Sequence, residues 1–166
     1  MERLFTPWRG EYVSGADAAT GCFLCEKPRE DADEANLIVA RGERVYAVLN
    51  LYPYNTGHTL VTPYVHGGDL TALDTATTGE LMTMTQTVVA ALRDEYRPDA
   101  FNVGMNLGRS AGAGTPDHLH VHVVPRWNGD TNFMPILGDT KVLAESLQQS
   151  YARVHGRLRS GFSAQT

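Results

Sequence analysis

Residues 118–124, His-Leu-His-Val-His-Val-Val, constrain the fold more than any other stretch of the chain. Three of the protein's 6 histidines occupy every second position here, with apolar residues between them. Because successive side chains of a β-strand point to opposite faces, a strand would place His118, His120 and His122 on one face and the apolar residues on the other. Adjacent imidazoles would then lie about 6–7 Å apart. The pattern predicts a strand that packs on helices with one face and offers a row of imidazoles to a small ligand with the other.

Four further strands are predicted from apolar runs bounded by turn residues. Two lie within 37–50 and join at 41–43, a third spans 58–63, and a fourth spans 101–107. Neighbouring strands can pair through short turns, so the sequence predicts an α+β fold in which an antiparallel sheet packs on helices. The sequence contains neither GxGxxG nor GxxxxGK[ST], which argues against a doubly wound nucleotide-binding fold.

Two helices are predicted, at 77–96 and 141–154. Thr77 and Glu80 have the spacing of a capping box, so we expect the first helix to begin there. Apolar residues recur at helical spacing in both segments and should face the core. These residues are Leu81, Met84, Val88 and Leu92 in the first helix and Leu143, Leu147 and Val154 in the second.

Length and charge limit the function classes. A chain of 166 residues fits one domain, which can bury a sizeable core. The net charge is -5 and no basic run is present, which argues against general nucleic-acid binding. The polar start is unlike a signal peptide, and no stretch is apolar enough to span a membrane. We therefore expect a cytoplasmic protein without a membrane partner.

A glycine-rich segment, 106–114, precedes the histidines. Backbone N–H groups can approach a ligand closely in such a segment and form a concavity that binds phosphate, and Ser110 adds a hydroxyl. A phosphate held there would lie over the imidazoles. One neutral imidazole could attack phosphorus while a protonated neighbour stabilises the charge that develops on oxygen. The combination indicates chemistry on a phosphate ester or anhydride.

The two cysteines, Cys22 and Cys25, have the spacing of a zinc knuckle. In a reducing compartment such a pair is more typical of a metal or redox site than of a structural disulfide. A zinc site would need two further ligands. A thioredoxin-like redox pair and two buried free thiols are the alternatives.

Residues 118–127, His-Leu-His-Val-His-Val-Val-Pro-Arg-Trp, resemble the signature of the histidine triad (HIT) superfamily of nucleotidyl hydrolases and transferases. Residues 106–112 are similar to the phosphate loop of that family, and residues 47–63 to its ribose-binding segment. Residues 3–9 and 125–135 further resemble actinobacterial HIT proteins close to diadenosine tetraphosphate phosphorylases. The likeness runs from about residue 3 to the last helix.

The resemblance implies a homodimer of α+β subunits, each with a five-stranded antiparallel sheet packed with two main helices. It implies one HIT domain over 1–166, in which 1–35 form an N-terminal extension with the CxxC knuckle. It also implies that His120 attacks the α-phosphate of a nucleotide and forms a nucleotidyl-histidine, which an acceptor then releases. His122 would contact the phosphate oxygens, His58 would support the triad through hydrogen bonds, and His118 would be its first member.

The resemblance also assigns the binding residues. Asn50 takes the place of the family's ribose ligand. The phosphate contacts would come from the loop residues Asn106, Gly108, Ser110, Ala111, Gly112 and Gly114. The loop lacks the Gln that the family usually carries after Ala-Gly, and Gly114 stands where the similar phosphorylases have Ser. Hydrolase, phosphorylase and transferase activities therefore stay open, with a dinucleoside polyphosphate such as diadenosine tetraphosphate or a nucleoside phosphoramidate as substrate.

In the zinc-containing branch of the superfamily, a histidine just past a strand end and the first triad histidine complete the metal site. Carried over, the resemblance implies a structural Zn²⁺ held by Cys22, Cys25, His66 and His118, with no open position for chemistry. A nucleotide-binding or interaction protein with little turnover is the rival function. A metal enzyme that uses the three triad histidines as ligands is disfavoured, because alternate strand residues do not converge readily on one ion.

Overall fold

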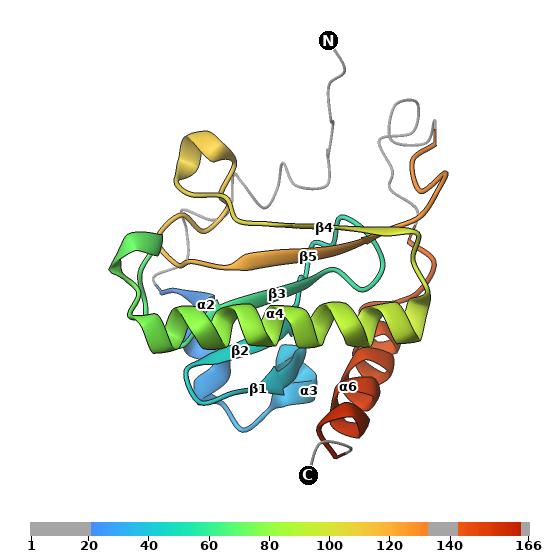
Figure 1. Cartoon of the computed structure of the whole chain (residues 1–166), viewed down its shortest axis with the longest axis horizontal. Coiled ribbons are helices and arrows are strands. Elements are labelled where there is room, and N and C mark those ends of the chain that lie inside the picture. Colours follow the sequence, from blue (N-terminus) through green and yellow to red (C-terminus); the bar gives the residue numbers. More distant parts are fainter. Residues whose placement is uncertain (1–20, 133–142, 164–166) are drawn as a thin grey trace.

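The computed structural model describes residues 21–132 and 143–163. Five strands form one antiparallel sheet in the order β1-β2-β3-β5-β4, and helices cover it (Figure 1). This confirms the α+β prediction. The strands are β1 (Ile38–Arg41), β2 (Val45–Leu49), β3 (Thr59–Pro63), β4 (Ala100–Gly104) and β5 (Val121–Arg126). The helices are α2 (Phe23–Glu26), α3 (Asp33–Asn36), α4 (Thr75–Tyr96) and α6 (Leu147–Ser163), with 3₁₀ turns η3 (Lys27–Arg29), η4 (Leu70–Ala72) and η5 (Arg109–Ala111).

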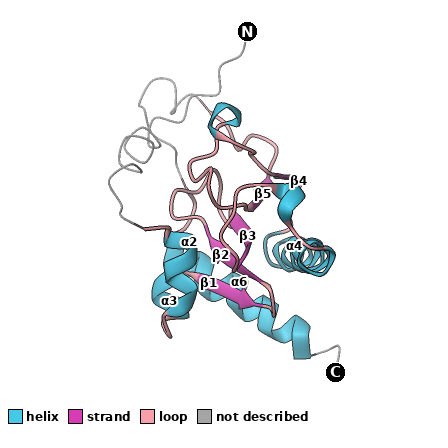
Figure 2. Cartoon of the chain, turned by 90° about the vertical axis from the view of Figure 1, so that its left-hand side faces the viewer, coloured by secondary structure: helices cyan, strands magenta, loops and turns pink. Residues whose placement is uncertain are grey.

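The strand register divides the central strands into two faces. Ala47, Val61 and Val121 lie side by side on β2, β3 and β5, and they are buried beneath α4, which contacts these three strands. Val48 and Leu60 pair in the next row, and Leu60 pairs with His122. This second row belongs to the opposite face. Figure 2 shows α4 on one side of the sheet, with α2 and α3 gathered at the β1–β2 end on the other side.

The apolar half of the histidine segment packs as the alternation predicts. Leu119, Val121 and Val123 are each at most 3% exposed and belong to the core cluster. The regular strand begins later than predicted, at Val121, because the backbone at the first two histidines makes other bonds. The N–H of Leu119 donates to the carbonyl of Gly67, over 2.7 Å, outside the sheet ladder. The fourth strand likewise ends at Gly104 rather than at 107.

Helix α4 begins at Thr75, and the prediction of a capping box at Thr77 and Glu80 is wrong. Asp74 is the N-cap residue, and its carboxylate accepts a hydrogen bond of 2.8 Å from the N–H of Thr77. An aspartate at this position also suits the positive end of the helix dipole. Glu80 instead accepts hydrogen bonds from the N–H groups of Glu43 and Arg44 in the β1–β2 turn. The predicted inward residues of this helix are all buried, as expected: Leu81, Met84, Val88 and Leu92.

Helix α6 begins at Leu147 rather than at 141, and residues 141–142 lie outside the described ranges. Ser146 and Gln149 form a reciprocal capping box at this start, because each side chain accepts a hydrogen bond from the other's N–H. Val154 is fully buried and Leu147 packs against the core, as predicted. Leu143 is half-buried but precedes the helix. No helix in the described ranges is long and apolar enough to cross a lipid bilayer.

Candidate active site and metal cluster

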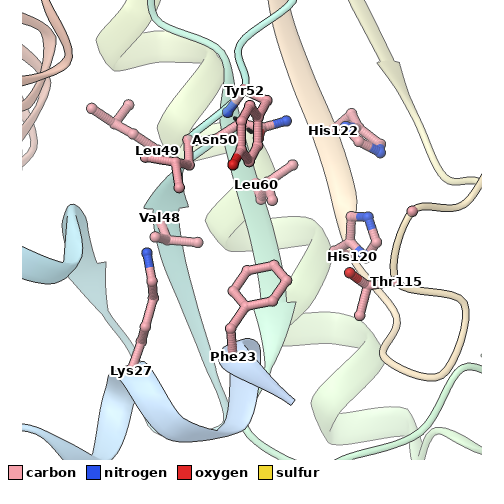
Figure 3. A pocket seen from close by; sticks show the side chains of 12 residues that line it. Phe23, Lys27, Val48, Leu49, Asn50, Tyr52, Leu60, Thr115, His120 and His122 are labelled. Carbon is pink, nitrogen blue, oxygen red and sulfur yellow. Dashed lines mark hydrogen bonds between the residues drawn. The ribbon is translucent and has the colours of Figure 1, made fainter. Parts of the chain in front are cut away.

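A pocket opens on the sheet face opposite α4. It encloses about 700 Å³, including its open mouth, and it is mostly apolar. His120 and His122 stand on one side of it, and Asn50 lies between them and the apolar wall (Figure 3). Its lining consists of Phe23, Lys27, Val48, Leu49, Asn50, Leu51, Tyr52, Leu60, Gly114, Thr115, His120 and His122. A pocket with a few convergent polar groups in an apolar lining suits a small organic ligand.

His58 and His122 are joined by a direct hydrogen bond between their rings. His58 Nε2 lies 3.0 Å from His122 Nδ1, and both rings are buried. The backbone N–H of Tyr54 donates to His58 Nδ1 over 3.0 Å, so in the neutral ring Nε2 carries the proton. His58 Nε2 therefore donates to His122 Nδ1, and a neutral His122 carries its proton on Nε2. The hydrogen-bond network thus assigns His122 a donor nitrogen that suits a phosphate oxygen.

His120 has the opposite arrangement. Its Nδ1 lies 2.7 Å from the backbone carbonyl oxygen of His118. A carbonyl oxygen only accepts, so Nδ1 carries the proton, and Nε2 of the neutral ring keeps its lone pair. The rings of His120 and His122 meet edge to face, with their centroids 4.9 Å apart. The pocket therefore holds a nucleophilic nitrogen beside a hydrogen-bond donor, which are the two groups that nucleophilic attack on phosphorus requires.

Asn50 follows directly after β2 and links the pocket to the histidine network. Its Oδ1 accepts a hydrogen bond of 3.0 Å from the N–H of Tyr52, and its Nδ2 lies 3.3 Å from His58 Nδ1. An amide oxygen has a second lone pair, and an amide nitrogen has a second hydrogen. Asn50 can therefore stabilise the loop that follows β2 and still offer a donor and an acceptor to a ligand in the pocket.

The glycine-rich segment adopts the backbone conformation that its glycines permit. Gly108 and Gly112 have φ values of 81° and 88°, a region that residues with a Cβ rarely adopt. They flank η5, and the segment is largely exposed. Only Gly114 of the predicted phosphate contacts lines the pocket. The other residues of the predicted set lie in the same loop but outside the lining: Asn106, Gly108, Ser110, Ala111 and Gly112.

The predicted metal ligands converge beside the pocket. The ligand atoms of Cys22, Cys25, His66 and His118 all lie within 4.8 Å of one another, although the residues come from three separate segments. His118 Nδ1 is 3.2 Å from the sulfur of Cys22 and 3.4 Å from that of Cys25. His66 Nδ1 is 3.4 Å from the sulfur of Cys25. Tetrahedral bonds of about 2.3 Å to sulfur and about 2.0 Å to nitrogen require similar separations.

The ring of His118 is oriented for metal binding. Its Nε2 donates to the carbonyl oxygen of Pro63 over 2.9 Å, which leaves the lone pair on Nδ1, the nitrogen that faces the two sulfurs. Burial lowers the pKa of His118, which favours the neutral form that a ligand requires. Burial and the adjacent Cys22 sulfur raise the pKa of the Cys25 thiol. A divalent cation would offset that effect by stabilising the thiolate. The donor set and its geometry therefore fit Zn²⁺.

The structure brings the histidine row together but divides its members between two sites. His120 and His122 line the pocket, whereas His118 belongs to the cysteine cluster. Phe23 and Lys27 were not among the predicted site residues, and they reach the pocket from the segment that carries the cysteines. Thr115, next to Gly114, was likewise not predicted. The one available signal for Phe23 was its place between the two cysteines, which ties it to the cluster.

Comparison with known proteins identifies the class to which this fold and site belong. The family model described as "HIT domain" matches residues 32–129. The chain is 44% identical over 157 residues to "AP-4-A phosphorylase" of Mycobacterium tuberculosis, an alignment that covers 90% of this chain and 80% of that protein. The protein therefore belongs to the HIT family.

Two solved structures resemble the chain over most of its length. A Zn-bound histidine triad family protein from Mycobacterium smegmatis superposes with a TM-score of 0.71 at 28% identity, and the match covers 87% of this chain and 97% of the other. A hypothetical histidine triad nucleotide-binding protein from Sulfolobus tokodaii gives a TM-score of 0.67 at 29% identity, with 86% and 93% covered. These matches agree with the five-stranded antiparallel sheet described above.

Proposed function

We propose that this protein cleaves a dinucleoside polyphosphate through a nucleotidyl-histidine intermediate on His120. The observation that carries the proposal is the hydrogen bond from His120 Nδ1 to the carbonyl oxygen of His118, which leaves Nε2 as a nucleophile inside the pocket. The neighbouring donor on His122 supports it. The 44% identical relative that is named AP-4-A phosphorylase supports this substrate class.

The reaction would proceed in two displacements at the same phosphorus. In the first, His120 Nε2 attacks the α-phosphorus, an N–P bond forms, and the bond to the bridging oxygen of the leaving nucleotide breaks. The leaving oxygen takes that electron pair, and the His122 N–H stabilises the charge on the phosphoryl oxygens. In the second, an oxygen of the acceptor attacks phosphorus, the N–P bond breaks, and Nε2 regains its lone pair.

We infer that the acceptor is inorganic phosphate. With diadenosine tetraphosphate the first step would release ATP and the second would release ADP. Incubation with and without phosphate tests this directly, with the products separated by ion-exchange chromatography. ADP that forms only with phosphate supports the proposal. AMP formed equally well without phosphate indicates a hydrolase, and no cleavage of any dinucleoside polyphosphate leaves the rival, a nucleotide-binding protein with little turnover. The phosphoramidate alternative predicts faster release of amine from an adenosine phosphoramidate.

We propose that the cluster holds one structural zinc through Cys22, Cys25, His66 and His118. The convergence of the four ligand atoms supports this assignment, as does the zinc in the similar M. smegmatis protein. When bound, the ion would tie the cysteine segment to the sheet, so that metal binding contributes to folding free energy. It would also fix His118, whose carbonyl oxygen orients the nucleophile.

We further propose a homodimer, a cytoplasmic location and a single HIT domain over 1–166. The family model begins at residue 32, close to the end of the proposed N-terminal extension over 1–35. Strand β4 supports the dimer because it is an edge of the sheet and its Val103 is 50% exposed. An edge strand with unpaired backbone groups can pair with a second copy. Light scattering at micromolar concentration tests the dimer, and the mass of one chain would refute it.

A further inference from the structure

We propose that Lys27 determines nucleobase specificity and that the pocket favours guanine over adenine. This inference rests on the proposed function only in one respect, namely that the pocket binds a nucleotide with its phosphate at the histidines. It goes beyond that function because it assigns a base-recognising residue and a preferred substrate class.

The placement of Lys27 in the pocket gives the first argument. Its side chain and those of His120 and His122 line the same pocket from opposite sides (Figure 3). Asn50 lies between these two sides, at the end of β2. A nucleotide with its phosphate at His120 and its ribose near Asn50 therefore directs its base toward Lys27.

The surroundings of Lys27 give the second argument. The base end of the pocket is formed by carbon-rich side chains, including Phe23, Val48 and Leu60. Among the described residues that line the pocket, Lys27 is the only lysine or arginine. The ammonium lies 5.9 Å from the centroid of the Phe23 ring. This ring can support one face of a planar base while the ammonium meets its edge.

The hydrogen bonds of Lys27 leave it able to bind a ligand. Its Nζ donates to the carbonyl oxygen of Asn36 over 3.3 Å, and this bond fixes the end of the side chain. An ammonium group has three donors, so two are left for a ligand. The nearby Glu30 carboxylate accepts a hydrogen bond of 2.6 Å from Asn36 Nδ2. Because Lys27 can donate but not accept, it favours a base edge that presents acceptors.

Guanine and adenine differ at such an edge. Guanine presents N7 and O6, two adjacent acceptors with which a lysine can pair, whereas adenine presents N7 beside the N6 amino donor. A donor facing another donor in an apolar pocket leaves both without a partner, and this kind of mismatch gives strong discrimination. We therefore expect Lys27 to favour guanosine nucleotides by about tenfold, the lower part of the range for a good pair with a base edge.

Binding of mononucleotides tests the inference without turnover. Calorimetry would measure the dissociation constants of GMP, AMP and ribose 5-phosphate for the full-length, zinc-loaded protein and for Lys27→Met. The unbranched methionine keeps the apolar stem and removes the ammonium. We expect the wild type to bind GMP about tenfold more tightly than AMP. Lys27→Met should raise the dissociation constant of GMP about tenfold and that of ribose 5-phosphate by less than about twofold.

Two further variants control the test. Arg29→Met removes a positive charge from the same 3₁₀ turn as Lys27. Because Arg29 is exposed and does not line the pocket, this variant should still bind GMP more tightly than AMP. Lys27→Arg retains donors and should keep part of the preference even if Lys27→Met folds poorly.

The outcomes are distinct. Wild-type protein that binds AMP as tightly as GMP would overturn the inference. If Lys27→Met binds ribose 5-phosphate more weakly by the same factor as GMP, the inference is also overturned, because Lys27 would then act on the phosphate. Failure of the enzyme to cleave any dinucleoside polyphosphate would refute the proposed function and leave the GMP preference measurable.

Discussion

Asp130 stabilises the loop that carries His58, and substitution of Asp130 gives a quantitative test of how the site is held together. Its carboxylate accepts hydrogen bonds from Arg126 Nε at 2.6 Å and Nη2 at 3.0 Å, and from Asn55 Nδ2 at 2.7 Å. The side chain of Asn55 also donates to the carbonyl oxygen of Pro125 at the end of β5, and the backbone carbonyl oxygen of Asn55 accepts from the N–H of His58. Asp130 thus links β5 to the turn that positions His58 beside His122.

The pKa of Asp130 gives the magnitude. The hydrogen bonds from Arg126 hold the pKa of this carboxyl at about 2, below its ordinary value of 3.8. The Asp130 side chain is 8% exposed but its partner Arg126 is 43% exposed, so solvent screens part of the interaction and the full conversion of the pKa shift is an upper bound. Each pH unit of such a gap corresponds to about 1.4 kcal/mol, so ionised Asp130 contributes at most about 2 kcal/mol to the free energy of unfolding at neutral pH.

The pH dependence follows from the direction of this shift. A carboxyl whose pKa is depressed in the folded state contributes fully above the ordinary value and loses its contribution as the pH falls toward the folded value. The contribution should therefore be complete near pH 6, reduced by roughly half near pH 3, small near pH 2 and absent by about pH 1. Asp130→Asn should cost at most about 2 kcal/mol at pH 7, and the difference from wild type should narrow between pH 4 and pH 3.

Urea unfolding at pH 7, 5, 4 and 3 measures the difference, provided that the denaturant slope is equal in the two proteins. Asp31→Asn is a matched control, because Asp31 is exposed and forms no hydrogen bond or ion pair in the described part of the chain. It should change the unfolding free energy by less than about 0.5 kcal/mol. A cost for Asp130→Asn that stays constant from pH 7 to pH 3, or that matches the control, would show that the reasoning is wrong.

Three other substitutions address the chemistry. His120→Ala should lower kcat by several orders of magnitude while nucleotide binding measured by calorimetry is largely retained; wild-type turnover would eliminate the covalent mechanism. Asn50→Ala should abolish a preference for ribonucleotides over 2′-deoxyribonucleotides in binding assays, and undiminished discrimination would refute its ribose contact. Cys22→Ser should lose about one zinc per chain by metal analysis. Chelation of the wild type should lower the Tm before activity falls, and protein isolated without zinc that is equally stable in chelator would refute the metal site.

The fold was largely predictable because it depends on periodicity. The alternation at 118–124 placed Leu119, Val121 and Val123 in the core, where the structure has them. Element ends were less predictable because they depend on single hydrogen bonds. Asp74 outcompetes Thr77 as the cap of α4, and Ser146 starts α6 several residues later than its apolar pattern suggests.

The sequence predicted the ligands of the metal cluster more completely than the lining of the pocket. The resemblance to the HIT family identified all four cluster residues, and the structure brings their ligand atoms within 4.8 Å of one another. The base end of the pocket had no such signal. Phe23 and Lys27 are four residues apart, and only the position of their segment beside β2 and β3 brings them opposite the histidines.

The spacing of the triad explains where the imidazoles lie, but their chemistry depends on which nitrogen of each ring is bound by the protein. Three neutral imidazoles at alternate positions are chemically alike until each receives a partner. The carbonyl oxygen of Pro63 leaves His118 a lone pair on Nδ1, for a metal. The carbonyl oxygen of His118 leaves His120 a lone pair on Nε2, for phosphorus. His58 gives His122 the opposite role, a donor on Nε2. In the proposed function one repeated residue would thus supply a ligand, a nucleophile and a hydrogen-bond donor, because partners outside the alternating positions set the tautomer of each ring.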